Sequence, residues 1–185
     1  SHRRRNFPAL AIGISYGNGQ TVPARLAAGD TGPHAEGLHH LLGIPAVQCI
    51  AAFRDSMFQL WAPRLYSHYR EHIESMHQAL LHLSRNFQRS IFSYATFNFS
   101  PNIQTFAHQD TLNLAYSWCS ITALGQFDHT KGGHLVLWDA RMIIKFPAGF
   151  TVLILPSAIL HSNIAVQQDE ERASFTQYCA GGIFQ

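Results

Sequence analysis

Three residues of the chain have the types and the spacing of a metal centre. His108 and Asp110 stand two apart, and His161 follows after a long interval. On an extended segment, side chains two residues apart point to the same side, so this pair offers an imidazole and a carboxylate together. Two imidazoles and one carboxylate form the facial triad of non-haem Fe(II) oxygenases and leave positions open for a cosubstrate and O₂. The pattern predicts iron held by His108, Asp110 and His161.

A basic residue downstream fits the cosubstrate of such a centre. 2-Oxoglutarate would chelate iron through its keto-acid end and would need a cation for its far carboxylate. Arg172 stands in the next predicted strand, and its planar guanidinium can bind a carboxylate through two parallel hydrogen bonds. Ser174 faces the same way and can donate another hydrogen bond. The alternative is that Arg172 is a surface residue beside Glu170 and Glu171.

These residues fall in the part of the chain that predicts β-structure. From residue 90 onward, short runs rich in Ile, Val, Phe, Tyr and Thr are separated by Gly, Pro and Asp turns. The predicted strands are 90–99, 112–123, 134–139, 142–146, 150–155 and 173–179. Many short strands at this spacing favour a jelly roll over a βαβ sheet. We expect an α+β fold with a double-stranded β-helix (jelly-roll) core over residues 90–185.

The N-terminal half predicts a helical layer that supports this core. Over residues 38–88, apolar side chains recur at intervals of three and four, and Pro63 suits a first helical turn. His68 and His72 share a helix face, but without an HExxH pattern they favour a polar surface over a metal site. Residues 1–37 are rich in Gly and Pro. Their 13–20 stretch predicts turns or edge structure, the alternative being a wall of the site.

The composition is that of a folded domain. The chain has 185 residues, 46% hydrophobic and 13% charged, which predicts one domain over 1–185 and excludes intrinsic disorder. The net charge of +2 is too small to indicate a nucleic-acid partner by itself. Cys49, Cys119 and Cys179 lack metal-like spacing, so we expect reduced thiols in an intracellular protein.

Targeting and membrane segments are not expected. The chain has no run of about 18 or more apolar residues, which predicts no membrane span. The basic start leads into no apolar h-region, as a secretory signal would. The first residue is not Met, so we expect that residues before Ser1 have been removed.

Several motifs resemble one family. The C-terminal half resembles the Fe(II)/2-oxoglutarate dioxygenases and, within them, the TET/JBP-like nucleobase oxygenases, especially the short basidiomycete fungal members. The motifs that carry this resemblance are HQDTLN at 108–113, GGHLVLWD at 132–139, HSN at 161–163 and RASFTQY at 172–178, with TFNF at 96–99 and the 13–23 stretch shared with the fungal group.

The resemblance implies roles for individual residues of the cosubstrate site. His108, Asp110 and His161 match the iron ligands. Arg172 and Ser174 match the residues that hold the far carboxylate of 2-oxoglutarate. His134 matches a histidine that contacts the same cosubstrate, although a core histidine with satisfied hydrogen bonds fits that position equally well.

The resemblance also implies a substrate, a methylated base in DNA, most simply 5-methylcytosine flipped out of the duplex. Asn113 falls where the family reads the cytosine, and Tyr178 where a ring packs on it. As alternatives, Asn113 would bond its own backbone at a strand start, and Tyr178 would be plain core. Animal TET enzymes carry a His where this chain has Ala180, which leaves the exact base open.

The expected activity is oxidation of 5-methylcytosine to 5-hydroxymethylcytosine, with further oxidation to formyl and carboxyl forms open, in the nucleus. Arg3, Arg4 and Arg5 would suit DNA phosphates, the alternative being a solvated terminus. Two other classes stay open. One is an oxygenase of N6-methyladenine, RNA, a protein or a small molecule, which would share every iron and 2-oxoglutarate residue. The other is a non-enzymatic jelly-roll binding module.

Overall fold

The computed structural model describes residues 8–17, 19–99 and 103–184. Arg3, Arg4 and Arg5 lie outside these residues. The chain divides into two compact units. The first unit comprises Ser1–Ala9 and Thr96–Thr176, and the second comprises Leu10–Ala95 and Gln177–Gln185. A single domain over 1–185 stays a prediction.

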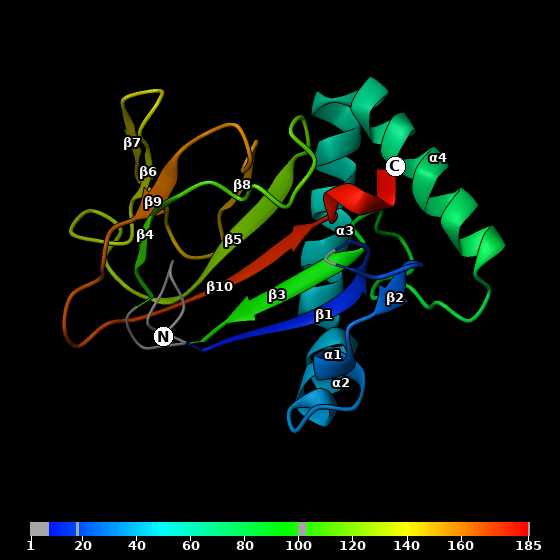
Figure 1. The fold of residues 1–185 in the computed structure, drawn as a ribbon. Helices are drawn as coiled ribbons and strands as arrows, with labels where there is room; N and C mark the ends of the chain where they lie inside the picture. The colour runs from blue at the N-terminus through cyan, green and yellow to red at the C-terminus, as the bar shows by residue number, and fades with distance from the viewer. Residues whose placement is uncertain (1–7, 18, 100–102, 185) are drawn as a thin grey trace. The chain divides into compact units, whose positions relative to one another are not determined.

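The first unit holds two antiparallel sheets. Its strands are β3 (Tyr94–Asn98), β4 (Thr105–His108), β5 (Cys119–Gln126), β6 (Leu135–Leu137), β7 (Met142–Ile144), β8 (Thr151–Ile154), β9 (His161–Asn163) and β10 (Glu171–Tyr178). Of β3 the unit includes the residues from Thr96 onward, and of β10 the residues up to Thr176. Within this unit the strand order is β3-β10-β5-β8 in one sheet and β4-β9-β6-β7 in the other (Figure 1). Two four-stranded sheets of this kind form a jelly roll. The predicted α+β fold class with a jelly-roll core is confirmed.

Aromatic rings and branched aliphatic side chains form the core of this unit. The rings of Phe97 on β3 and Phe175 on β10 stack with centroids 4.7 Å apart and planes 4° from parallel. Ile103, Phe146 and Ile154 are buried as well. Such side chains pack well on a pleated surface, which explains why the apolar runs of the sequence become strands.

The observed strands differ from the predicted ones at their boundaries and in number. The expected strand over 90–99 begins only at Tyr94. The expected strand over 112–123 begins only at Cys119, since residues 111–118 are occupied mainly by turns. Strands β4 (four residues) and β9 (three residues) were not predicted.

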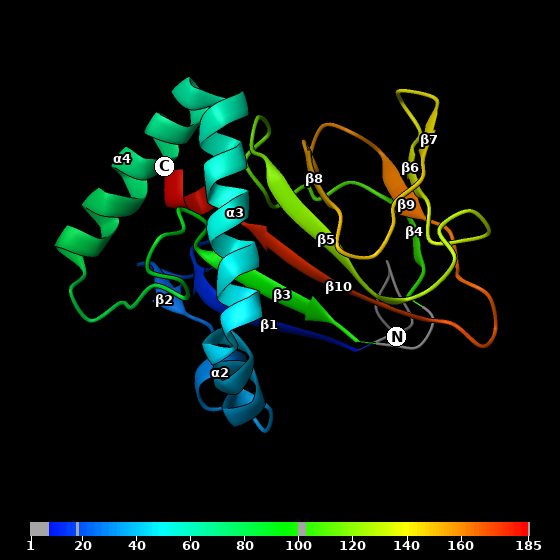
Figure 2. The ribbon, with the colours of Figure 1, turned by 180° about the vertical axis from the view of Figure 1, so that it is seen from behind.

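The second unit contains the helices. These are α1 (Ala27–Asp30), α2 (Ala35–Gly43), α3 (Pro45–Trp61), α4 (Pro63–Ala79) and the 3₁₀ turn η1 (Gly181–Phe184). Pro45 and Pro63 each stand in a first helical turn, where proline is tolerated. From the end of α3, α4 turns back (Figure 2). The fully buried ring of Phe58 on α3 packs on Tyr69 of α4, with centroids 5.1 Å apart.

No single described helix is both long and apolar enough to cross a membrane, whereas α2 and α3 pass that test together across a 69° bend.

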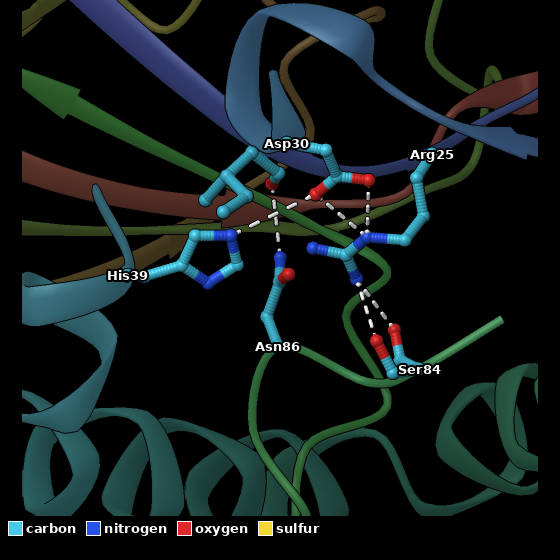
Figure 3. Close-up of polar contacts among 6 residues, drawn as sticks. Arg25, Asp30, His39, Ser84 and Asn86 are labelled. Atoms are coloured by element: carbon cyan, nitrogen blue, oxygen red, sulfur yellow. Dashed lines mark hydrogen bonds and ion pairs between the residues drawn. The ribbon is translucent and has the colours of Figure 1, made fainter. Parts of the chain in front are cut away.

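A polar cluster fastens the N-terminal strands of the second unit, β1 (Ala9–Ser15, from Leu10) and β2 (Ala24–Arg25), to the segment after α4. Arg25 Nε donates to both carboxylate oxygens of Asp30, at 2.9 and 2.8 Å, and its Nη1 donates to the Ser84 carbonyl at 2.8 Å. Asn86 Nδ2 donates to the carbonyl of Ile12 on β1 at 2.9 Å (Figure 3). These bonds hold the loop against β1.

The Gly-rich stretch 13–20 begins as strand rather than as loop, because β1 extends to Ser15. Gly13 has φ +137°, and a Cβ there would collide with the carbonyl oxygen of Ser93. The amide of Ile14 donates to that same carbonyl at 2.9 Å. Only glycine permits this close approach of two backbones.

Candidate metal centre

The two histidines of the predicted triad come from neighbouring strands of the first unit. His108 ends β4 and His161 begins β9, and the antiparallel register pairs them directly. Their ring centroids are 4.3 Å apart. Together with Asp110, each residue offers one ligand atom, and the three atoms lie within 4.8 Å of one another. The structure therefore brings the predicted ligands together at one point. Among the described residues this is the one such group.

The backbone fixes which nitrogen each histidine offers. His108 Nδ1 lies 2.7 Å from the carbonyl oxygen of Phe106, and His161 Nδ1 lies 2.9 Å from that of Ile159. A carbonyl only accepts, so each Nδ1 carries the proton and donates it. In the neutral imidazole this leaves the lone pair on Nε2, which is the form that binds a metal.

Asp110 lies in the turn beyond β4 rather than on the strand, which ends at His108. Pro156 and Ser157, which follow β8, hold this turn in place. The Asp110 amide donates to the carbonyl of Pro156 at 2.8 Å. The Ser157 hydroxyl lies 3.1 to 3.2 Å from three carbonyl oxygens, those of Asp110, Asn113 and Leu114. These contacts place the carboxylate beside His108 Nε2, 3.9 Å from Oδ1.

Arg172 is a buried cation that has no counter-ion in the part of the chain that the structure describes. It stands on β10 with 3% of its surface exposed, so the alternative of a surface strand residue is wrong. Its Nε makes no hydrogen bond, and within the described residues no carboxylate pairs with its guanidinium. The ring of Phe127 lies 6.0 Å from its Cζ. Burial lowers the pKa of Arg172 to about 10. A buried charge is costly unless it is paired, so this geometry fits an anionic ligand.

The strand that carries Arg172 has a neighbour at very close range. Gly125 on β5 has φ +112°, and a Cβ there would collide with the carbonyl oxygen of Glu171, the residue before Arg172. Glycine at this position lets the two backbones approach.

Ser174 has a partner that sequence reasoning missed. Asn98, the last residue of β3, donates from Nδ2 to Ser174 Oγ at 2.9 Å, and both side chains are buried. The signal was a polar residue inside the apolar run 96–99, because a buried amide on a strand needs a partner.

The remaining predicted residues are placed as follows. His134 precedes β6, and its Nδ1 is buried without a hydrogen-bond partner among the described residues. Asn113 Nδ2 is likewise buried and unpartnered there, and the Asn113 amide donates to the Asp110 carbonyl at 2.9 Å. Tyr178 belongs to the second unit, where its ring stacks on Tyr94 with centroids 4.7 Å apart. The roles of all three stay predictions.

The two histidines of α4, His68 and His72, belong to no group of three possible metal ligands among the described residues. His72 Nδ1 lies 2.8 Å from the carbonyl oxygen of His68, one turn earlier on α4. That nitrogen therefore donates within the helix, and both rings lie near the ring of Phe184, with centroids 5.7 and 5.4 Å from it.

Comparison with known proteins places the fold. No family model matches the chain. A search of curated proteins gave no match either. Among solved structures, a structure of NgTET1 in complex with 5mC DNA aligns with a TM-score of 0.68 at 16% identity, covering 96% of this chain and 62% of that one. The chain thus spans less than two thirds of the length of NgTET1.

Two further structures align less well. An oxidoreductase of the 2OG-Fe(II) oxygenase family from Burkholderia pseudomallei gives a TM-score of 0.47 at 17% identity, covering 92% of this chain and 66% of that one. The 2OG complex of the viral collagen prolyl hydroxylase from Paramecium bursaria Chlorella virus-1 gives 0.37 at 13% identity, covering 47% and 57%.

The donor set of the first unit, two imidazoles and one carboxylate, is that of a non-haem Fe(II) centre. The buried Arg172, which has no carboxylate partner among the described residues, fits the far carboxylate of 2-oxoglutarate. The chain has the fold of NgTET1, and its residues fit Fe(II) and 2-oxoglutarate.

Proposed function

We propose that the chain is an Fe(II)/2-oxoglutarate-dependent dioxygenase of the TET/JBP-like family that oxidises the methyl group of 5-methylcytosine in DNA. The observation that carries the proposal is Arg172, a residue with 3% of its surface exposed and no carboxylate partner among the described residues, in the same unit as a His-Asp-His group. A metal-binding module without a cosubstrate would have no use for a buried cation, which costs free energy in the ligand-free fold.

Each residue of the site would have one task. His108, Asp110 and His161 would hold the iron on one face and leave the other positions open. Arg172 and Ser174 would bind the far carboxylate, and His134 would contact the cosubstrate through the buried Nδ1 that has no partner among the described residues. Iron, 2-oxoglutarate and O₂ together supply decarboxylation of the keto acid coupled to hydroxylation of a C–H bond. The protein supplies orientation and a dry pocket.

The substrate is supported by two observations. The structure with the same fold, NgTET1, is in complex with 5mC DNA. Asn113 Nδ2, three residues beyond Asp110, has no partner among the described residues, and an amide can both donate to and accept from a base edge. The flipped methyl group would then face the iron. With DNA as the proposed substrate, we propose the nucleus as the location of the protein.

A second candidate is a different modified base, N6-methyladenine in particular. It stays open because the chain has Ala180 where animal TET enzymes carry a His, so that contact does not assign the base to cytosine. Both candidates share the iron and 2-oxoglutarate residues.

The test is mass spectrometry of nucleosides from duplexes carrying 5-methylcytosine or N6-methyladenine, incubated with the protein, Fe(II), ascorbate and 2-oxoglutarate. Succinate release is followed in the same tube. We expect 5-hydroxymethylcytosine and succinate together, and neither without 2-oxoglutarate. Oxidation of N6-methyladenine alone would make it, rather than 5-methylcytosine, the substrate base. Succinate with no modified base would overturn the proposal of a DNA substrate. Absence of both products would overturn the proposal that the chain is an enzyme.

A further inference from the structure

Asn98 and Ser174 form a buried polar pair close in sequence to Arg172, the residue proposed to bind the far carboxylate of 2-oxoglutarate. Asn98 is 9% exposed and Ser174 is 6% exposed. They stand on β3 and β10, which are neighbours in the sheet of the first unit. Asn98 Nδ2 donates to Ser174 Oγ over 2.9 Å. Ser174 is two residues from Arg172 on the same strand, so both side chains lie on one face.

The direction of this bond determines what Ser174 can offer. A serine hydroxyl has one proton to donate and can accept through its oxygen. Because Asn98 donates to that oxygen, the Ser174 proton must point elsewhere. Ser174 Oγ makes no other hydrogen bond with the described residues, so its proton is available. A buried hydroxyl proton without an acceptor in the protein is free to donate to an acceptor on a bound ligand.

We propose that Asn98 is a positioning residue for the cosubstrate. By donating to Ser174 Oγ, it turns the Ser174 proton toward the far carboxylate that Arg172 binds, so that the carboxylate meets two donors. The inference rests on the proposed function and deepens it, since it explains selection of a five-carbon keto diacid over a keto acid without the second carboxylate.

Asn98→Asp is the sharpest variant, because it has the same shape and the opposite hydrogen-bond character. An aspartate accepts the Ser174 proton, turns it away from the ligand and adds a negative charge beside the site. Asn98→Ala and Ser174→Ala remove one partner each without adding charge. Asn86→Asp is the matched control, since the Asn86 side-chain amide also donates a hydrogen bond, to the Ile12 carbonyl in the second unit.

The experiment measures equilibrium binding of 2-oxoglutarate and of 2-oxopentanoate to Mn(II)-loaded protein by calorimetry, without turnover. 2-Oxopentanoate carries a methyl group where 2-oxoglutarate carries its far carboxylate. For Asn98→Asp we expect 2-oxoglutarate binding to weaken by about 10- to 100-fold, the range for hydrogen bonds to charged groups, and 2-oxopentanoate binding to stay within about twofold. Thermal unfolding of each variant checks its fold.

Double substitution separates positioning from structural support. If Asn98 acts through Ser174, Asn98→Ala, Ser174→Ala and the double variant weaken 2-oxoglutarate binding by similar factors. The inference would be overturned if the affinity losses of the two single variants multiply in the double variant. It would also be overturned if the binding of both keto acids weakens equally. Unchanged selectivity in Asn98→Asp would also overturn it while the enzyme stands. Failure of the wild-type protein to bind 2-oxoglutarate would overturn the proposed function and the inference together.

Discussion

His108 and His161 face each other from paired positions of two short strands, with their ring centroids 4.3 Å apart. Each ring is held by the carbonyl of the residue two places before it, Phe106 and Ile159 respectively. The register of β4 against β9 therefore builds the metal centre. A slip of one residue would turn one imidazole to the opposite face of the sheet.

Asp110→Ala removes the one carboxylate of the triad. We expect Fe(II) affinity to fall by at least about 100-fold, more than for loss of an outer-shell partner, and turnover to stop. The measurement is an anaerobic Fe(II) titration. Gln109→Ala is the control, because Gln109 bonds only the exposed Ala158 carbonyl and offers no ligand atom. Equal affinities of the two variants would contradict the triad.

Ser157→Ala tests how the turn that carries Asp110 is held. The variant leaves three carbonyl oxygens without their shared hydroxyl, which lies 3.1 Å from that of Asp110. We expect a loss of about 1 kcal/mol in stability and a metal affinity about 10-fold lower. Urea unfolding of the metal-free protein and the Fe(II) titration measure the two effects. If stability falls while metal affinity stays at the wild-type value, Ser157 does not position Asp110.

Arg172→Met tests the cost of the unpaired buried charge. Without ligand, we expect the variant to unfold at the wild-type temperature or higher, because removal of buried charge is neutral or stabilises by about 1–4 kcal/mol. With 2-oxoglutarate at 100 times Kd, the wild-type protein should gain about 2.7 kcal/mol and the variant nothing. Arg172→Lys, which keeps the charge and loses the planar fork, should bind weakly. Ligand stabilisation in Arg172→Met would refute the assignment.

Asn113→Ala tests substrate selection. We expect oxidation of methylated DNA to fall by about 10-fold or more, the cost of an unmade hydrogen bond to the base, while 2-oxoglutarate decay without DNA stays near its wild-type rate. Succinate and modified nucleosides are measured in parallel. Equal loss of both activities would assign Asn113 to the metal turn rather than to the base.

Tyr66→Phe gives a pH-dependent loss of stability in the second unit. Tyr66 Oη donates to Asp55 Oδ2 at 2.7 Å, and the Ile91 amide donates to Oδ1 at 2.8 Å. Burial raises the pKa of Asp55 above 3.8, and both bonds oppose this rise. A carboxyl group whose pKa is raised by folding adds to the free energy of unfolding below pH 3.8. That contribution is lost as the pH rises through the pKa of the group in the folded protein.

Because the phenol stabilises ionised Asp55, its removal should cost about 1–3 kcal/mol, with the deficit growing as pH rises from 3.8. Urea unfolding between pH 4 and pH 8 measures it. Tyr94→Phe is the control, since the Tyr94 hydroxyl makes no hydrogen bond with the described residues. A deficit that is constant with pH would show that Asp55 is not the partner that matters.

The candidate site was predictable where its signal is local in sequence. The His-x-Asp spacing, a distal His and an Arg two residues before a Ser are patterns of residue type, and the structure brings the three predicted ligands together. The jelly roll followed from the repeated apolar runs. Pro45 and Pro63 mark helix starts in the same way, through the fixed φ of proline.

Other features depend on contacts between distant segments. Neither Asn98 nor Ser157 belongs to a motif that reveals its partner, and each acts on a segment far along the chain. Strand β9 has three residues, so pairing with β4 and β6 defines it rather than its own pattern. The apolar residues of 112–118 suggested a strand, but the ties to Ser157 and Pro156 hold this stretch in turns.

Gly125 determines how closely β5 can approach the strand that carries Arg172. Its missing side chain lets β5 press against the peptide that precedes Arg172. A Cβ at this position would collide with backbone atoms of Glu171 and would strain a φ of +112°, so no other residue fits there unless one of the two strands shifts. The place of the Arg172 guanidinium therefore depends on a glycine of the neighbouring strand.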